Sequence, residues 1–118
     1  MATTFNVSHG GIRIRVKLLP TVADVHRSHQ HGCKRDMSGK AARAFFLPTQ
    51  SPTAKYIGTV VLPLARADLR ELVPHEVAHA VIHAQNGVLS HDDEACCTAI
   101  GIISARIHKR IEQLRGEV

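Results

Sequence analysis

The sequence predicts an α+β fold, in which a small mixed β-sheet is followed by a pair of helices. Apolar and polar residues alternate in parts of the first half, as in β-strands. In the second half, apolar residues recur at the three- and four-residue spacing of helices. The chain has 118 residues, 44% of them hydrophobic and 21% charged, so we expect a single domain over residues 1–118.

The first half contains two predicted elements in succession. Residues 11–19 alternate apolar and basic side chains, which is typical of a strand with one buried face and one positive, solvated face. Pro20 ends this strand. Thr21 follows in a position where it can cap a short helix that extends to about His31.

Two further strands are predicted before the helical half. Residues 44–47 form a short apolar stretch, and residues 55–64 form a longer one that is rich in β-branched side chains. Pro63 lies near the end of the second stretch and cannot donate a ladder hydrogen bond. We therefore interpret residues 55–64 as an edge strand that directly precedes the first helix of the pair.

Two long helices are predicted after Pro63. The first extends to about Asn86 and ends at Gly87. It begins close to Pro74, because proline is tolerated best in a first helical turn, or it begins earlier and bends there. The second begins in the acidic segment 90–93, which has a capping-box pattern, and extends to about Leu114.

Charge is distributed unevenly along the chain. Residues 1–60 carry nine Lys and Arg against two Asp, a balance of +7, whereas residues 61–118 have a balance of −2. The basic first half leaves nucleic acid open as a partner, although a solvated basic surface is the favoured interpretation. The chain has three cysteines, no apolar run of membrane-spanning length and no signal-peptide core. These features predict a cytoplasmic protein without membrane partners.

The first helix of the pair carries His75-Glu76-Val77-Ala78-His79. Histidines four residues apart on a helix project from one face, one turn apart, and can bind one tetrahedral metal ion. Glu76 lies beside the first histidine, where it can accept a proton from a metal-bound water without ligating the metal. This division of roles is the one expected of a zinc hydrolase.

A catalytic zinc also needs a third protein ligand. Asp92, Asp93 and Glu94 all lie in the first turn of the second helix, which a helix hairpin would bring towards the histidines. We choose Glu94, because the small residues after it allow close approach of the helices. Asp92 and Asp93 are interpreted as capping residues. Thr98 lies one turn after Glu94 and could orient its carboxylate.

The run from His75 to His83, followed after a loop by Asp-Asp-Glu-Ala at 92–95, resembles the Glu-zincin metallopeptidases. It is most similar to the small ImmA/IrrE-type members, over about residues 60–107. The resemblance implies a minimal zincin-like domain that hydrolyses protein or peptide substrates. It also implies that His75, His79 and Glu94 bind zinc and that Glu76 is the general base.

Several other residues are weighed for the site. An oxyanion donor besides the metal could be Tyr56, His91 or His108. His83 lies two turns from His75, too far to share its metal, and is interpreted as a supporting or packing residue. The remaining candidates are interpreted as residues that do not bind metal. At least one of the adjacent cysteines Cys96 and Cys97 is expected to pack as a small apolar residue. A polar helix end is the interpretation of the other four, which are His26, His29, His31 and Cys33.

The function predicted from these residues is zinc-dependent peptide hydrolysis. The predicted edge strand at residues 55–64 would bind an extended substrate beside the metal. One alternative is a zinc-stabilised binding module for a protein or nucleic acid, in which Glu76 has no catalytic role. Another is a degenerate zincin that binds a partner protein without cutting it. A closed fourth ligand would favour this module, whereas an open water position favours the enzyme.

Overall fold

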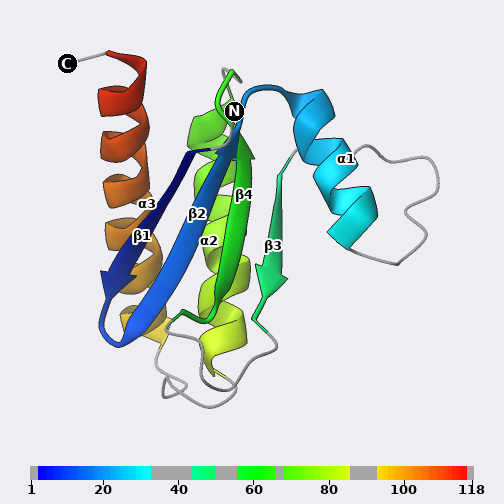
Figure 1. The fold of residues 1–118 in the computed structure, drawn as a ribbon. Helices are drawn as coiled ribbons and strands as arrows, with labels where there is room; N and C mark the ends of the chain where they lie inside the picture. The colour runs from blue at the N-terminus through cyan, green and yellow to red at the C-terminus, as the bar shows by residue number, and fades with distance from the viewer. Residues whose placement is uncertain (1–2, 33–43, 50–55, 66–67, 86–92, 117–118) are drawn as a thin grey trace.

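The computed structural model describes residues 3–32, 44–49, 56–65, 68–85 and 93–116 (Figure 1). Its elements, in chain order, are β1 (Thr3–His9), β2 (Ile12–Leu19), α1 (Val22–Gly32), β3 (Phe45–Pro48), β4 (Gly58–Pro63), α2 (Leu69–Gln85) and α3 (Asp93–Arg115). The sheet order is β1-β2-β4-β3, with β2 and β4 parallel and the other two pairs antiparallel. The predicted α+β class is confirmed for the described residues, which form a four-stranded mixed sheet and three helices.

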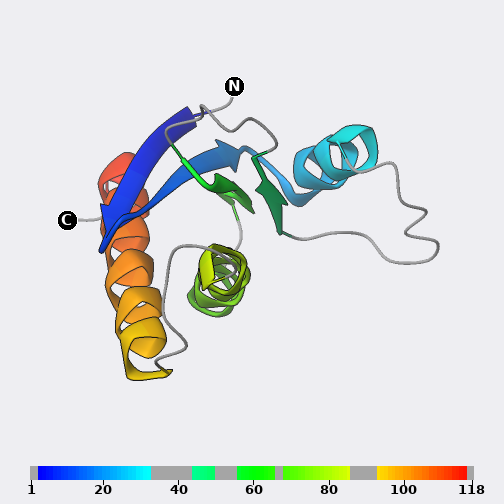
Figure 2. The same ribbon diagram turned by 90° about the horizontal axis from the view of Figure 1, so that it is seen from below.

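The sheet separates the helices into two layers (Figure 2). Helices α2 and α3 cover one face, where the larger apolar core lies. Its fully buried side chains include Ile14, Val16 and Leu62 of the sheet, Val77 of α2, and Ile103 and Ile107 of α3. Helix α1 covers part of the opposite face through a smaller cluster of Leu19, Val25, Phe45 and Val61. Among the described residues, no helix covers the rest of that face (Figure 2).

Strand β1 was not anticipated from the sequence. It pairs with β2 through a two-residue turn at Gly10 and Gly11, whose φ angles are +57° and +84°. Both glycines therefore lie in the left-handed region that a tight hairpin turn requires. The alternating residues before a Gly-Gly pair were the signal for this hairpin.

The structure defines where helices α1 and α2 begin. Thr21 caps α1, because its hydroxyl accepts the Asp24 N–H at 3.2 Å and the Asp24 carboxylate accepts the Thr21 N–H at 3.2 Å. Helix α2 begins at Leu69 and contains Pro74 in its interior. Of the two alternatives for Pro74, the earlier start is therefore correct.

The strand before α2 is an inner strand, so the prediction of an edge strand at residues 55–64 is wrong. Strand β4 lies between β2 and β3, and the Leu64 N–H donates to the Leu19 carbonyl at 2.8 Å. Successive N–H groups of a strand point to opposite sides, so the backbone nitrogen of Pro63, which carries no hydrogen, faces β3. The paired residues of β3 begin at Phe45, opposite Val61, so Pro63 lies beyond that ladder.

In the sheet formed by the described strands, the free edge on the α2 side belongs to β3 instead. The Thr49 N–H donates to the Ile57 carbonyl at 3.0 Å, which fixes the alternation of this antiparallel pair. By that alternation, the backbone polar groups of Phe46 and Pro48 point to the free edge. Pro48 is thus the edge proline, at a position where its missing N–H costs the sheet nothing.

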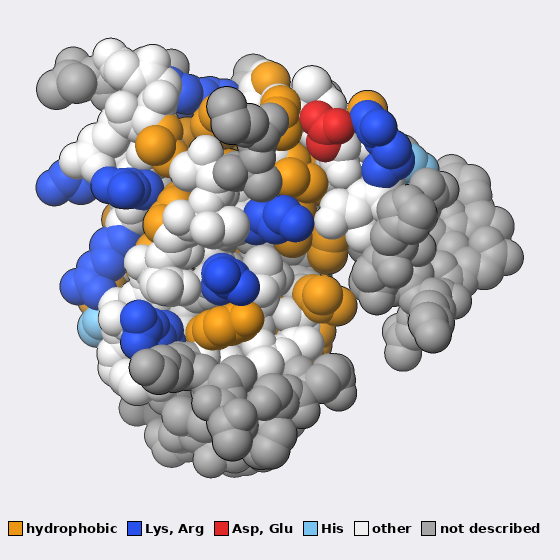
Figure 3. Space-filling view, in the orientation of Figure 1, with side chains coloured by type: hydrophobic (Ala, Val, Ile, Leu, Met, Phe, Trp, Pro, Cys, Tyr) orange, Lys and Arg blue, Asp and Glu red, His pale blue; other side chains and the backbone are white. Residues whose placement is uncertain are grey.

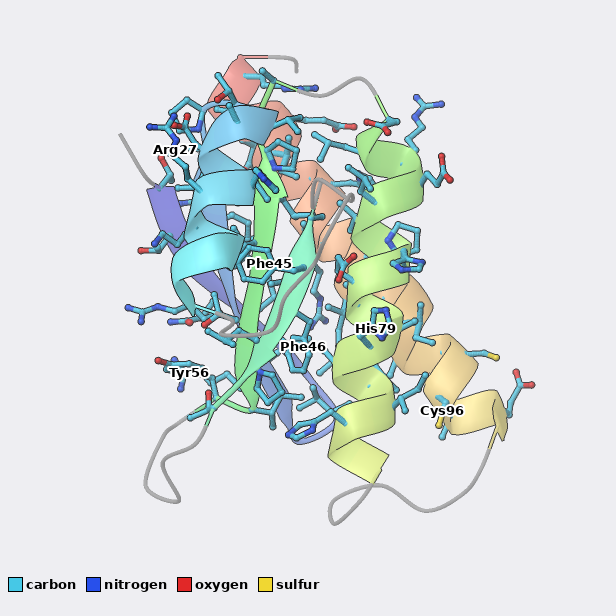
Figure 4. All side chains as sticks on the ribbon, turned by 90° about the vertical axis from the view of Figure 1, so that its right-hand side faces the viewer. Arg27, Phe45, Phe46, Tyr56, His79 and Cys96 are labelled. Atoms are coloured by element: carbon cyan, nitrogen blue, oxygen red, sulfur yellow. The ribbon has the colours of Figure 1, made fainter. Side chains whose placement is uncertain are left out.

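Gly58 allows β3 to approach β4 closely. A Cβ atom at this position would lie 2.4 Å from Cε1 of Phe46 and 2.7 Å from the Leu47 carbonyl oxygen. The Phe46 ring occupies this space and lies between β3 and α2 (Figure 4). A side chain at position 58 would displace that ring or the β3 backbone.

We therefore expect Gly58→Ala to lower the free energy of unfolding by about 1–3 kcal/mol, the usual cost of overpacking. Gly101→Ala is the matched control, because its Cβ meets nothing within 4 Å on the exposed side of α3. Gly101→Ala should instead raise the free energy of unfolding by about 0.5–1 kcal/mol, because alanine is the better helix former. Urea denaturation of both variants checks this, and equal effects would contradict the close approach at Gly58.

Candidate metal site on helix α2

Helix α2 has an apolar side and an exposed side. Val73, Val77, Ala80 and Val81 are each 0% exposed and anchor the helix to the core. His79 is two residues from both Val77 and Val81, which places it about 160–200° around the helix from each. The histidines of the motif consequently lie on the side of α2 that is open to solvent, and His75 is 65% exposed.

The two histidine rings face each other on that side. Nε2 of His75 lies 3.3 Å from Nε2 of His79, and the ring centroids are 4.9 Å apart with an edge-on angle of 80°. Two imidazole nitrogens that share one tetrahedral zinc at about 2.0–2.1 Å lie about 3.3 Å apart. The pair therefore has the spacing that a shared zinc requires, and the donor set suits that metal.

Glu76 lies next to this pair but is buried. It is 6% exposed, and its Oε2 lies 3.9 Å from Nε2 of His75. That distance is too long for a direct hydrogen bond and is within reach of one bridging water. Burial raises the pKa of the Glu76 carboxyl above its ordinary value, and positive charge on His75 and His79 opposes this shift.

The predicted third ligand is not assembled with the histidines. Among the residues that the structure describes, no three His, Cys, Asp or Glu side chains form a metal-binding group. Glu94 is exposed in the first turn of α3, and Thr98 is exposed one turn later. His91, Asp92 and the side chain of Asp93 lie outside the described residues. Glu94 as a zinc ligand and Thr98 as its supporting residue remain predictions.

The structure describes the surroundings of two of the proposed oxyanion donors, Tyr56 and His108. The Tyr56 hydroxyl accepts a hydrogen bond from Nη1 of Arg15 at 3.3 Å. Arg15 is on the exposed face of β2, so Tyr56 is separated from His79 by the sheet (Figure 4). His108 is half-buried on α3, and burial lowers its pKa, with a nearby Glu112 carboxylate opposing and Arg70 assisting that shift. Arg70 is in the first turn of α2, so His108 lies near that end of the helix.

The residues interpreted as packing can also be placed. The His83 ring is 5.8 Å from the Phe46 ring, centroid to centroid, which confirms a packing role. Cys96 is buried in the main core, which confirms that one of the adjacent cysteines packs as a small apolar residue, whereas Cys97 is exposed. His26 is half-buried on α1, and the side chains of His29, His31 and Cys33 lie outside the described residues.

Phe46 was missed at the sequence level. It connects β3 to α2 through His83 and occupies the space above Gly58. No local pattern indicates such a contact, because it depends on β3 pairing with β4 on the edge next to α2. The Gly58 in an otherwise β-branched stretch was the available signal of a close backbone approach.

Comparison of this chain with family models, with curated proteins and with solved structures finds no match. The assignment of a function therefore depends on the residues themselves. Within the described part of the chain, no helix is both long and apolar enough to cross a bilayer.

The raised pKa of Glu76 predicts how Glu76→Gln changes stability with pH. The folded state holds the carboxyl proton more tightly than the unfolded state, whose value is near 4.5. Glu76 therefore lowers the free energy of unfolding as pH rises from that value through the higher folded pKa. In EDTA, Glu76→Gln should be more stable than wild type at pH 7.5, with a smaller difference at pH 4.

Chemical denaturation at the two pH values checks this prediction. Glu71→Gln serves as the control, because Glu71 is exposed in the first turn of α2. A wild type that is equally or more stable than Glu76→Gln at pH 7.5 would show that the buried carboxylate is compensated by a partner.

Proposed function

We propose that the chain is a zinc-dependent metallopeptidase whose catalytic centre is the exposed side of α2. The observation that supports this proposal best is the 3.3 Å separation of the two Nε2 atoms, with the buried carboxyl of Glu76 beside them. A pair of surface histidines with no catalytic role would not require a buried glutamate between them in the sequence, and Glu76 is only 6% exposed.

In this proposal, Nε2 of His75 and Nε2 of His79 hold zinc, and Glu94 supplies a carboxylate oxygen as the third ligand. Zinc, when bound, supplies a Lewis acid that acidifies a water molecule and polarises the scissile carbonyl. His75 is largely open to solvent, so both metal and substrate can reach this side of the helix. The exposed, free thiol of Cys97 suits a reducing compartment such as the cytoplasm.

Glu76 serves as the general base and then as the general acid. Its carboxylate accepts a proton from the attacking water, and the same oxygen returns this proton to the leaving amine. A carboxyl whose pKa is raised by burial holds the transferred proton better than an exposed one. Fixed packing of the helix keeps the carboxyl aimed at the histidine pair, which reduces the entropic cost of the reaction.

The substrate peptide is proposed to bind along the free edge of β3 and not along β4. Strand β3 contacts α2, and the backbone N–H and carbonyl of Phe46 point to that edge. An extended peptide can add to such an edge through main-chain hydrogen bonds. Pro48 has no N–H, so only its carbonyl oxygen can bond to the substrate backbone, which limits the pairing at the end of β3.

The experiment compares zinc content and peptide cleavage in wild type and Glu76→Gln, with a mixed-peptide library as substrate. We expect zinc in both proteins and a rate that is lower by about 10²–10⁴-fold in Glu76→Gln, because the proton acceptor is lost. Glu71→Gln is the matched control, since Glu71 is exposed in the first turn of α2 and its change should leave both zinc and cleavage in place.

Zinc bound without cleavage by any variant would favour the binding module over the enzyme. Cleavage that survives Glu76→Gln undiminished would exclude Glu76 as the base. A wild type that takes up no zinc after supplementation would refute the proposed site.

A further inference from the structure

The sheet face opposite α2 and α3 carries a row of positive charge. Strand β2 directs Arg13, Arg15 and Lys17 to this face, while its alternate residues are buried in the core. These side chains repeat every second residue, at about 6.6–6.8 Å along the strand. Their partners on β1 are small and uncharged, namely Ser8 opposite Arg13, Asn6 opposite Arg15 and Thr4 opposite Lys17.

Negative charge is scarce on this side of the described structure. Asp24 of α1 is the nearest acidic residue in sequence to β2, and its carboxylate pairs with Arg27 at 2.9 Å. Among the described residues, no ion pair engages Arg13, Arg15 or Lys17. Figure 3 shows Lys and Arg side chains across the sheet, with acidic side chains gathered at one place near α1.

The positive charge continues around β1 onto α3. A hollow of about 380 Å³ is lined by Phe5, Asn6, Val7 and Ser8 of β1 and by Arg106 and Arg110 of α3. The two arginines are four residues apart and therefore share one side of the helix. Arg106 donates to the Ser8 carbonyl, and Arg110 lies over the Phe5 ring, 5.8 Å from its centroid.

A second hollow lies over the sheet face that carries Arg15 and Lys17. It measures about 300 Å³ and lies between the sheet and α1. Arg15 and Lys17 line it, together with the hydroxyl-bearing residues Thr4, Ser28 and Thr59. We define the basic face by Arg13, Arg15 and Lys17 of β2, and Arg106 and Arg110 lie beyond the β1 edge of the sheet.

We propose that the basic face binds single-stranded nucleic acid, at a site separate from the histidine pair on α2. Regularly spaced cations along a strand suit a polymer with regularly spaced anions, and hydroxyl and amide groups between them can donate to phosphate oxygens. Arg15 lies over the Tyr56 ring, 5.4 Å from its centroid, so an aromatic surface for base stacking adjoins the cations.

Other polyanions fit this surface less well. An acidic peptide is recognised by clustered cations through charge alone, which leaves the Tyr56 ring beside Arg15 without a role. A DNA duplex is commonly read by a helix or ribbon inserted into its major groove, whereas the cations of the basic face lie along a strand within the described sheet. Single strands bind to sheet surfaces that combine cations with an aromatic ring.

The test measures fluorescence anisotropy of a labelled uridine 20-mer with the full chain at 50–200 mM KCl. Arg15→Gln/Lys17→Gln should weaken binding by at least about tenfold at low salt. The slope of log K against log[KCl] should become less negative by about 1.4, because two phosphate contacts are lost. Arg70→Gln/Lys109→Gln is the matched control. It removes the same charge from exposed positions of α2 and α3, and Lys109 lies about 200° around α3 from the buried Ile107.

Two further measurements separate the kinds of partner. Tyr56→Ala should weaken binding of the uridine 20-mer by at least about fivefold, whereas Tyr56→Phe should retain it, because stacking needs the ring alone. A labelled glutamate 20-mer and a DNA duplex should bind more weakly than the uridine 20-mer. Thermal unfolding of each variant confirms that it is folded.

Three results would overturn the proposal. These are no binding of the uridine 20-mer at 50 mM KCl, equal weakening by the two double variants, and tighter binding of the glutamate 20-mer or the duplex. The glutamate result would assign the surface to an acidic protein partner. None of these results depends on peptidase activity.

Discussion

The arrangement of the molecule depends on the apolar contact between α2 and the sheet. Val73, Val77, Ala80 and Val81 form a continuous buried side of the helix and fix its rotation about its own axis. Once this side is fixed, Glu76 must enter the margin of the core, and the histidines must face outward. Burial of the glutamate is then a consequence of packing, and it supplies the raised pKa that the proposed proton transfer requires.

The sheet gives this small domain distinct working surfaces. One face supports α2 and α3 (Figure 1) and thereby the histidine pair. The other face presents the cations of β2. The free edge of β3 lies beside α2, and the Phe46 ring connects them. Because Gly58 leaves room for that ring, a single glycine in an inner strand helps to position the edge proposed to bind substrate.

Local sequence patterns were sufficient to predict the helices and strands that are determined by residues close together in the chain. The period-two alternation at residues 11–19, the Thr21 cap and the helical spacing around His75 all matched the observed elements. Strand order was not available in this way, because it depends on contacts between distant segments. Pro63 was therefore taken as an edge residue, although it occupies the end of an inner strand. The same reason explains why the contact of Phe46 with His83 was not foreseen. It also explains why Glu94 was chosen from the number of ligands that zinc requires and from the small residues that follow it, and not from a known contact.

The central claim is that His75 and His79 share one zinc ion whose other ligands are oxygens. X-ray absorption at the zinc edge of the loaded protein tests it most directly. The account predicts two imidazole nitrogens at about 2.0–2.1 Å and the remaining coordination by carboxylate and water oxygens at about 2.0–2.2 Å. A sulfur ligand at about 2.3 Å would contradict it, because coordination by cysteine would close the position needed for water and indicate a structural zinc site.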